Sequence, residues 1–146
     1  MNEKEYLEKA KKFLNQAKFV DTAINDKTEE KQRLTDLATK ITSTYGGVPT
    51  CSVKKSNGIA DILNGVVDLE NDINNEIATL ISLKQRISQA INTIPNIKHK
   101  IILNKKYLNF KTWEKIAEEL NIDERWLRKL HNDILIENRN KLEKFF

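Results

Sequence analysis

Basic side chains recur at short spacing between Asp123 and Leu130, where the sequence reads DERWLRKL. Arg125 and Arg128 lie three positions apart, so they share one face if this stretch is helical. An arginine guanidinium can donate two parallel hydrogen bonds to the edge of a guanine base. These residue types therefore predict contact with double-stranded DNA. A helix in this stretch would leave Glu124, Arg125, Arg128, Lys129 and Asn132 pointing away from the core.

Two helices joined by a turn would present these residues to a partner. Thr112 can cap a first helix, Asn121 can adopt the left-handed turn conformation, and Asp123 can cap a second helix. A helix-turn-helix is therefore predicted, the motif whose second helix enters a DNA major groove. Its first helix should bury Trp113, Ile116, Ala117 and Leu120, and its second helix Leu127, Leu130, Ile134 and Leu135.

Another helix is predicted from Asn96 to Leu108, immediately after Pro95. Its core face would consist of Ile97, Ile101, Ile102, Tyr107 and Leu108. The lysines of this helix fall outside that face, where they are available to a phosphate backbone. Together with polar residues of the helix-turn-helix, the candidate backbone contacts are Lys98, Lys100, Lys105, Lys106, Lys111, Thr112 and Asn132.

The excess positive charge lies in the same part of the chain. Residues 1–94 hold 13 Lys/Arg and 13 Asp/Glu, whereas residues 95–146 hold 12 and 8. A phosphate backbone would be met where this excess lies. The alternative is a charged, solvated helical surface that has no partner.

A long helix is predicted from Glu3 to Thr44, because apolar residues recur along it with heptad spacing. Lys27 and Lys31 interrupt that apolar seam. The helix should therefore bend there, expose that turn, or meet acidic residues of a partner. A loop is predicted at 45–58, where three of the four glycines and a proline gather.

A second long helix, predicted from Ile59 to Thr93, has the strongest heptad periodicity, with Glu76 as its one polar miss. Such a seam must be buried against the first helix as a hairpin, against a second chain, or against both, and both are favoured. The predicted fold is all-α, with a long-helix dimerisation module at 1–94 and a DNA-binding unit at 95–146. The oligomerisation residues would be Ile59, Ile62, Val66, Leu69, Ile73, Leu80 and Ile87.

Composition excludes several classes of protein. With 146 residues, two prolines and four glycines, the chain suits one helical domain or two small units. Cys51 is the only cysteine, which favours a reducing cytoplasm, and no apolar run is long enough for a membrane span. A glycine-rich phosphate loop and a zinc or nucleophile set are missing, since His99 and His131 stand apart. Neither an enzyme nor a cofactor is expected.

The segment IPNIKHKIILNKKYLNFKTWEKIAEELNIDERWLRKLHNDIL, which begins at Ile94, resembles the C-terminal promoter-reading domain of bacterial sigma factors. The whole chain is also similar to small proteins of phages and prophages of Gram-positive bacteria. Shared segments include LATKITST at Leu37–Thr44, DLENDIN at Asp68–Asn74 and YLNFKTWEKIA. That family is grouped with phage late-gene transcription regulators of the ArpU/RinA type.

The resemblance implies that Glu124, Arg125, Arg128 and Lys129 are the DNA-reading positions. Trp126 departs from the sigma pattern. It is expected to close an edge of the core, with contact to a sugar or a thymine methyl group as the alternative. The sigma domains that bind core polymerase and melt DNA have no counterpart, so a stand-alone sigma factor is excluded.

Three functions compete. The first is a phage transcription regulator that binds DNA as a homodimer or higher oligomer in the cytoplasm of a bacterial host. The second is an interaction protein that docks on RNA polymerase or another protein and has little DNA contact. The third is a DNA-packaging protein resembling a terminase small subunit. It ranks last because the DNA-reading unit of such proteins typically comes first in the chain.

Overall fold

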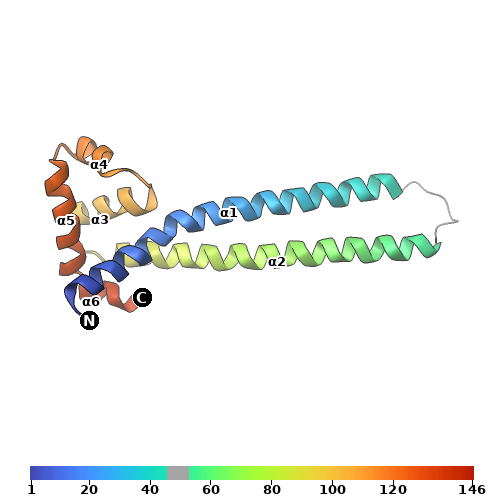
Figure 1. Ribbon diagram of the computed structural model, residues 1–146, viewed down its shortest axis with the longest axis horizontal. Helices are drawn as coiled ribbons and strands as arrows, with labels where there is room; N and C mark the ends of the chain where they lie inside the picture. Colours follow the sequence, from blue (N-terminus) through green and yellow to red (C-terminus); the bar gives the residue numbers. More distant parts are fainter. Residues whose placement is uncertain (46–52) are drawn as a thin grey trace. The chain divides into compact units, whose positions relative to one another are not determined.

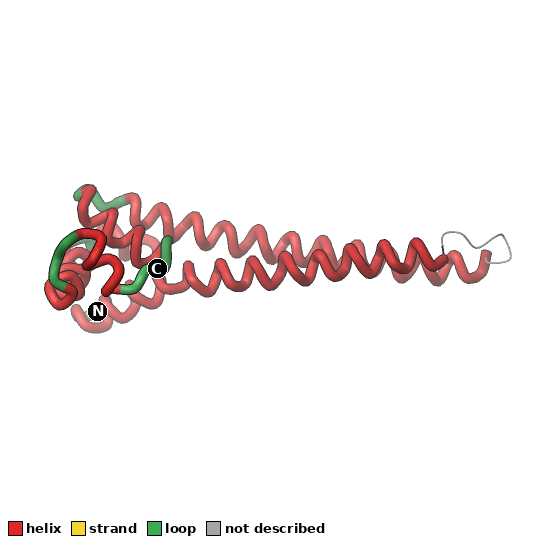
Figure 2. The backbone as a smooth tube through the Cα atoms, turned by 90° about the horizontal axis from the view of Figure 1, so that it is seen from above, coloured by secondary structure: helices red, strands yellow, loops and turns green. Residues whose placement is uncertain are grey.

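The computed structural model describes residues 1–45 and 53–146, and its regular elements are all helices (Figures 1 and 2). The all-α prediction is therefore confirmed. No helix among the described residues is long and apolar enough to cross a lipid bilayer. The elements are α1 (Glu3–Tyr45), α2 (Val53–Asn92), α3 (Ile97–Leu103), the π-helical η1 (Asn104–Leu108), α4 (Trp113–Leu120), α5 (Glu124–Glu137), α6 (Arg139–Leu142) and the 3-10 helix η2 (Glu143–Phe145).

The two long helices form the predicted hairpin (Figure 1). α1 ends within one residue of the predicted boundary, but α2 begins at Val53, earlier than the predicted Ile59. The predicted loop at 45–58 is too long, because Gly58 lies inside α2. A glycine within a helix costs only about 1 kcal/mol relative to alanine, so it does not stop a long one. Cys51 lies outside the described residues.

The chain divides into two compact units. One, called here the terminal unit, consists of Met1–Asp21 and Ser82–Phe146. The other, the hairpin unit, consists of Thr22–Ile81. This division differs from the predicted one at 1–94 and 95–146, because the short C-terminal helices bury their apolar faces against both long helices.

The core of the terminal unit joins elements that are far apart in sequence. Tyr6 is fully buried, and its hydroxyl donates a hydrogen bond of 2.5 Å to the main-chain oxygen of Leu135 in α5. Lys84 of α2 forms an ion pair of 2.6 Å with Asp21 of α1. The buried side chains shared among the helices include Ala10, Leu14, Ala17, Ile87, Ile91, Ile102, Leu103, Ile116, Leu127 and Ile134.

The helix predicted from Asn96 to Leu108 is present but changes its winding. Asn96 caps α3 by accepting from the Lys98 and His99 main-chain N–H groups, and π-helical turns follow from Asn104. The predicted core face is wrong at Ile97, which is 72% exposed, and at Ile101. The buried side chains are Ile102, Leu103 and Tyr107.

The hairpin unit explains two of the three polar interruptions of the heptad seams. Lys27 of α1 forms an ion pair of 2.8 Å with Glu76 of α2, and a longer one of 3.4 Å with Glu30. Of the alternatives open for the Lys27 break, an acidic partner is therefore the one observed, and it belongs to the same chain. These carboxylates raise the pKa of Lys27, chiefly through the contact with Glu76.

The predicted oligomerisation residues separate into two groups. The first group, Val66, Ile73 and Ile87, is buried within the chain, and Ile59 and Leu80 are half-buried. The second group is Ile62 and Leu69, which are 53% and 51% exposed. Burial of the first group accounts for the hairpin, and the second group remains available on α2.

Candidate nucleic-acid interface

The turn between α4 and α5 has the geometry predicted for a helix-turn-helix. Thr112 caps α4 through its hydroxyl, which accepts from the Lys115 main-chain N–H at 3.2 Å. Asn121 ends α4 in the left-handed conformation, with φ 53° and ψ 47°. Asp123 then caps α5 by accepting from the Trp126 N–H at 3.2 Å. The predicted break and its three residues are confirmed.

Burial on one side of α5 determines which side chains face outward. Leu127, Ile134 and Leu135 are buried as predicted, and Leu130 is half-buried. The opposite side carries Arg125 and Lys129, both exposed. Two of the four predicted base-contacting residues therefore lie on the outermost face of the helix.

The other two predicted base-contacting residues pair with each other on the flank of α5. Glu124 accepts from Arg128 at 2.7 Å and 3.2 Å, and the Arg128 side chain is 58% exposed. Exposed ion pairs of this kind contribute at most about 1 kcal/mol, so a stronger anion can take the place of the carboxylate. The ion pair therefore orients the Arg128 side chain without preventing it from binding another anion.

Trp126 is 53% exposed and lies outside the side chains that pack on the core. The interpretation that it closes a core edge is wrong, because Trp126 lies on a different face of α5 from the buried Leu127 and Ile134. A large aromatic surface therefore lies beside Arg125 and Lys129 on the presented side of the helix.

The predicted backbone-contacting lysines do not act as one set. Lys105 and Lys111 each lie 2.6 Å from Glu119 of α4. Their hydrogen bonds, that of Lys105 first, lower the pKa of the Glu119 carboxyl to about 2. The two lysines therefore hold η1 and the following loop against α4. Lys98 is exposed and Lys100 half-exposed on α3, away from this cluster.

Lys106 lies in a different environment from its neighbours. Its ammonium group sits 4.8 Å from the centre of the Trp113 ring, a cation–π distance. Partial burial, then repulsion by Arg128 and Lys18, lowers its pKa. Cations from α1, η1 and α5 are therefore close enough to repel one another when no anion is present.

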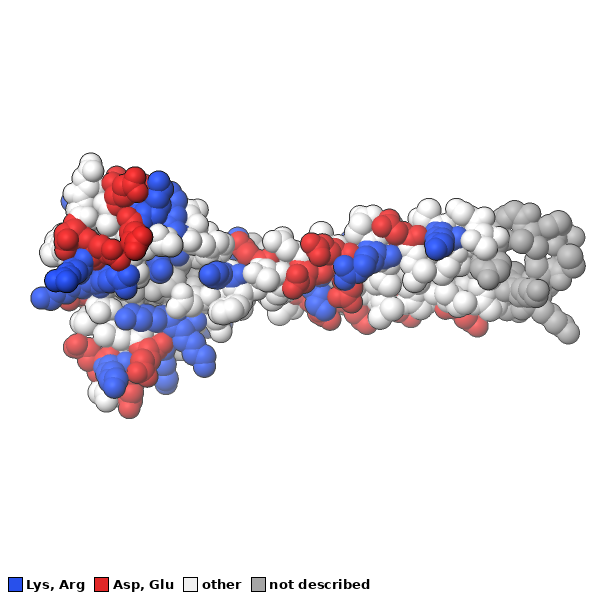
Figure 3. Space-filling model, turned by 45° about the horizontal axis from the view of Figure 1, so that its top comes forward, with Lys and Arg blue, Asp and Glu red and all other residues white. Residues whose placement is uncertain are grey.

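Lys11, Lys106 and Arg128 surround a hollow of about 460 Å³, named here the basic hollow. A smaller hollow of about 100 Å³ shares Asn15 and Lys106 with it and adds Lys18 and Lys111. Among the described residues, no carboxylate lines either of them. Figure 3 shows many basic side chains over the terminal unit, with acidic side chains next to them. The polar side chains that line the basic hollow are Lys11, Asn15, Lys106, Arg128 and Asn132.

Aromatic side chains and a histidine line the basic hollow beneath its cations. His131 is 3% exposed, its Nε2 lies 2.7 Å from the Tyr107 hydroxyl, and its ring meets the Trp113 ring edge-on at 4.7 Å. Burial, followed by the charges of Lys11 and Lys106, lowers the pKa of His131 to about 3. The imidazole is therefore neutral, and the positive charge comes from the lysines and arginine.

Sequence reasoning missed the contribution of α1 to this site. Lys11, Asn15 and Lys18 follow the i, i+4, i+7 spacing of one helix face, which was a usable signal. The heptad analysis considered only the apolar positions of this helix and so did not single out these residues. Of the other predicted contacts, Asn132 lines the hollow, whereas the Thr112 hydroxyl is engaged in its cap.

Comparison with known proteins places the chain in a family. No curated protein and no solved structure matches it. The family match covers residues 49–136, which include α2, α3, η1, α4 and most of α5. This is more than half of the chain, and the helix-turn-helix lies within it. The chain belongs to the family described as "Protein of unknown function (DUF1492)".

Proposed function

We propose that this protein is a phage-encoded transcription regulator, of late genes, that binds double-stranded DNA through its helix-turn-helix. The observation that supports this most is the left-handed turn at Asn121, which leaves Arg125, Arg128 and Lys129 on the outward and flanking sides of α5. The resemblance to sigma factors and to ArpU/RinA-type regulators points in the same direction. The regulator would use α5 as its reading helix.

Binding would use two kinds of contact, one with base edges and one with the phosphate backbone. Arg125 and Lys129 would meet base edges in the major groove, with Arg128 released from Glu124 by the DNA. The basic hollow would hold the backbone beside that groove, because Lys11, Lys106 and Arg128 surround it with no carboxylate among its lining side chains. Lys105 and Lys111 would act indirectly, by bracing η1 on α4 through Glu119.

Self-association is part of the same proposal. Ile62 and Leu69 are large apolar side chains that the hairpin leaves exposed, and Gly65 lies between them on α2 with open space around it. An apolar flank of this kind is typical of a helix that packs on another chain. A homodimer formed there would carry two reading helices, the arrangement with which dimeric helix-turn-helix proteins bind two half-sites.

The test begins with double-stranded DNA selected by the full chain from a random library. Binding of the selected sequence and of an unrelated one is then measured by anisotropy across a range of salt. Each phosphate contact contributes about 0.9 to the slope of log affinity against log salt. The Lys11→Gln/Lys106→Gln variant should therefore weaken both sequences and lower the slope by about two.

A matched control is Lys40→Gln, which removes a cation of α1 that lies in the hairpin unit. It should leave the slope unchanged. If no sequence is enriched, or if the control lowers the slope as much as the variant of the hollow, the DNA-binding proposal fails. The interaction-protein reading would then lead, because an exposed Trp126 is typical of protein interfaces.

A further inference from the structure

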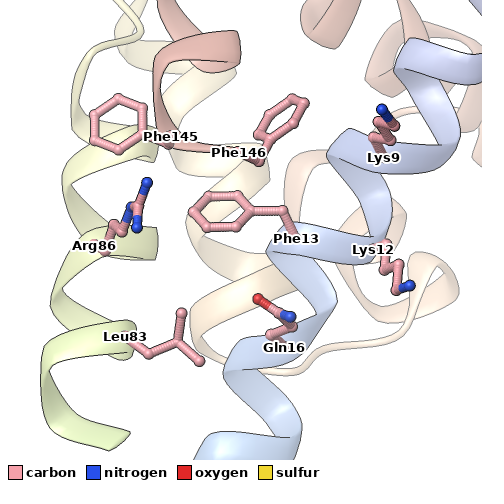
Figure 4. A pocket seen from close by; sticks show the side chains of 8 residues that line it. All are labelled: Lys9, Lys12, Phe13, Gln16, Leu83, Arg86, Phe145 and Phe146. Carbon is pink, nitrogen blue, oxygen red and sulfur yellow. The ribbon is translucent and has the colours of Figure 1, made fainter. Parts of the chain in front are cut away.

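A second hollow in the terminal unit has a different chemistry from the basic hollow. It has a volume of about 440 Å³ and lies between the first part of α1, the last part of α2 and η2. Its apolar lining comes from Phe13, Leu83, Phe145 and Phe146, which Figure 4 shows on α1, α2 and the chain end. We call this the phenylalanine pocket.

The aromatic rings of the pocket are held by packing but keep accessible surface. Phe13 is buried, and its ring centre lies 5.5 Å from that of Phe146. Phe146 also stacks on Tyr6 at 6.0 Å, yet it is 39% exposed. An apolar side chain entering the pocket would therefore meet fixed rings and displace water from them.

Three cations border this apolar surface. Arg86 lies on the α2 side, and Lys9 and Lys12 lie along α1 (Figure 4). Among the described residues, none of the three forms an ion pair, and no Asp or Glu side chain lines the pocket. Neighbouring cations behave differently, since Lys84 pairs with Asp21 and Arg139 with Glu143.

We propose that the phenylalanine pocket binds an acidic segment of a partner protein, with an apolar side chain of that segment inserted between the rings. The cations stand on two helices rather than at one point, which suits carboxylates spaced along a chain. Lys9 and Lys12 are one helical turn apart, about 5–6 Å, a spacing that successive acidic side chains can match.

This partner is distinct from DNA in both position and chemistry. The pocket shares no lining residue with the basic hollow, and its phenylalanines give a phosphate backbone nothing to bind. An acidic, apolar segment matches both the charge and the rings. The protein would thus hold a protein partner on one surface while α5 contacts DNA from another.

The experiment uses the full chain and a fluorescent peptide rich in Glu with a central Phe-Leu pair. A second peptide has Ser-Ser in place of Phe-Leu. The first should bind and the second should bind at least about tenfold more weakly, because burying two large apolar side chains is worth more than 1.4 kcal/mol. Lys12→Glu/Arg86→Glu should weaken binding of the first peptide about tenfold, because two ion pairs with its carboxylates are lost.

The matched control is Lys4→Glu/Lys40→Glu, which changes net charge equally but touches no lining residue. It should keep binding within about twofold, since screened charges at a distance contribute little. Phe146→Ser tests the rings without emptying the buried core and should weaken the Phe-Leu peptide alone.

Three results would overturn the proposal. One is absence of binding by either peptide, and another is equal binding of both, which would mean general attraction of negative charge. The third is loss of self-association in the Lys12→Glu/Arg86→Glu variant, with no competition by the peptide. In that case a second copy of the chain occupies the pocket. Circular dichroism confirms that each variant is folded before binding is measured.

Discussion

At the scale of single residues, Arg125 should affect sequence discrimination, Lys11 and Lys106 general affinity for DNA, and Arg128, which also lines the basic hollow, both. Arg125→Ala/Arg128→Ala should remove most discrimination between the selected and unrelated DNA, at roughly 1–3 kcal/mol for each lost base contact. Binding of unrelated DNA should persist through the hollow. The measurement is the ratio of the two affinities at one salt concentration.

Glu124 provides the control for Arg128, because the two side chains form an ion pair of 2.7 Å. Glu124→Gln frees the guanidinium and removes a negative charge, so it should strengthen binding of both DNA sequences. If Glu124→Gln instead erases the preference for the selected sequence, the carboxylate itself reads a base. An unchanged affinity ratio in the double arginine variant would contradict the recognition-helix assignment.

The buried His131 predicts a specific dependence of stability on pH. The folded state lowers its pKa from 6.5 to about 3, so the unfolded chain binds more protons than the folded one between these values. The stability that the neutral imidazole contributes is therefore complete above pH 6.5 and is lost as the pH falls below it. The expected loss is about 1.4 kcal/mol per pH unit in that window.

Urea unfolding between about pH 7 and pH 5 measures this slope, since the lowered pKa of Glu119 matters only in stronger acid. His131→Gln removes the titrating ring and should flatten the curve. Tyr107→Phe deletes the hydroxyl near Nε2 and should cost about 1–3 kcal/mol at pH 7. A slope that survives in His131→Gln would assign the proton uptake to other groups.

Local chemistry allowed much of the site to be predicted from sequence. The side chains of Thr112 and Asp123 accept from main-chain N–H groups three residues away, and Asn121 contributes its own backbone angles, so residue types and spacing were sufficient. The partners of Lys105 and Lys111 were not predictable, because Glu119 reaches them only after α4 folds back on η1. Tertiary contacts, rather than residue type, turned two candidate phosphate ligands into a structural brace.

At the scale of elements, the turn at Asn121 is the most sensitive point of the helix-turn-helix. Its φ of 53° is costly for most residues but available to glycine. Asn121→Ala should destabilise the protein by about 1–2 kcal/mol, whereas Asn121→Gly should change stability much less. Urea denaturation of the pair checks this. Equal losses in both variants would mean that the Asn side chain, rather than the backbone angle, stabilises the turn.

Heptad spacing predicted α1 and α2, because a long apolar stripe must be buried, and this holds for any partner that covers the stripe. It did not predict that the polar interruptions at Lys27 and Glu76 would face each other. Their pairing depends on the register of the hairpin, which neither helix specifies alone. The π-helical turns at Asn104–Leu108 were also beyond reach, because residue types there are compatible with an ordinary helix.

At the scale of the whole molecule, the core combines residues that lie far apart in the sequence. The predicted boundary at residue 94 follows a proline and a change in charge. In the structure, Tyr6 and Phe13 belong to the same unit as the C-terminal helices. Sequence periodicity reports which faces are buried but not which distant segment covers them, so it could not group the first part of α1 and the last part of α2 with the C-terminal helices.

The last prediction concerns self-association through the exposed flank of α2. Ile62→Asp/Leu69→Asp should give a monomer in light scattering while helicity and unfolding remain unchanged, because both side chains are already half in solvent. Ile73→Asp is the contrast, since it buries an unpaired charge inside the hairpin and should unfold it at a cost of several kcal/mol.

A substitution at Gly65 tests whether a second copy of the chain packs on this flank of α2. An added Cβ at this position meets nothing within 4 Å in the single chain, so Gly65→Ala should stabilise an isolated helix by about 1 kcal/mol. If two copies pack closely along Ile62 and Leu69, the same methyl group separates them, and the dimer should weaken while the monomer becomes more stable. For this one variant, light scattering should therefore show less dimer, while thermal melting should show a more stable monomer. A dimer strengthened by Gly65→Ala would move the interface to another face of α2.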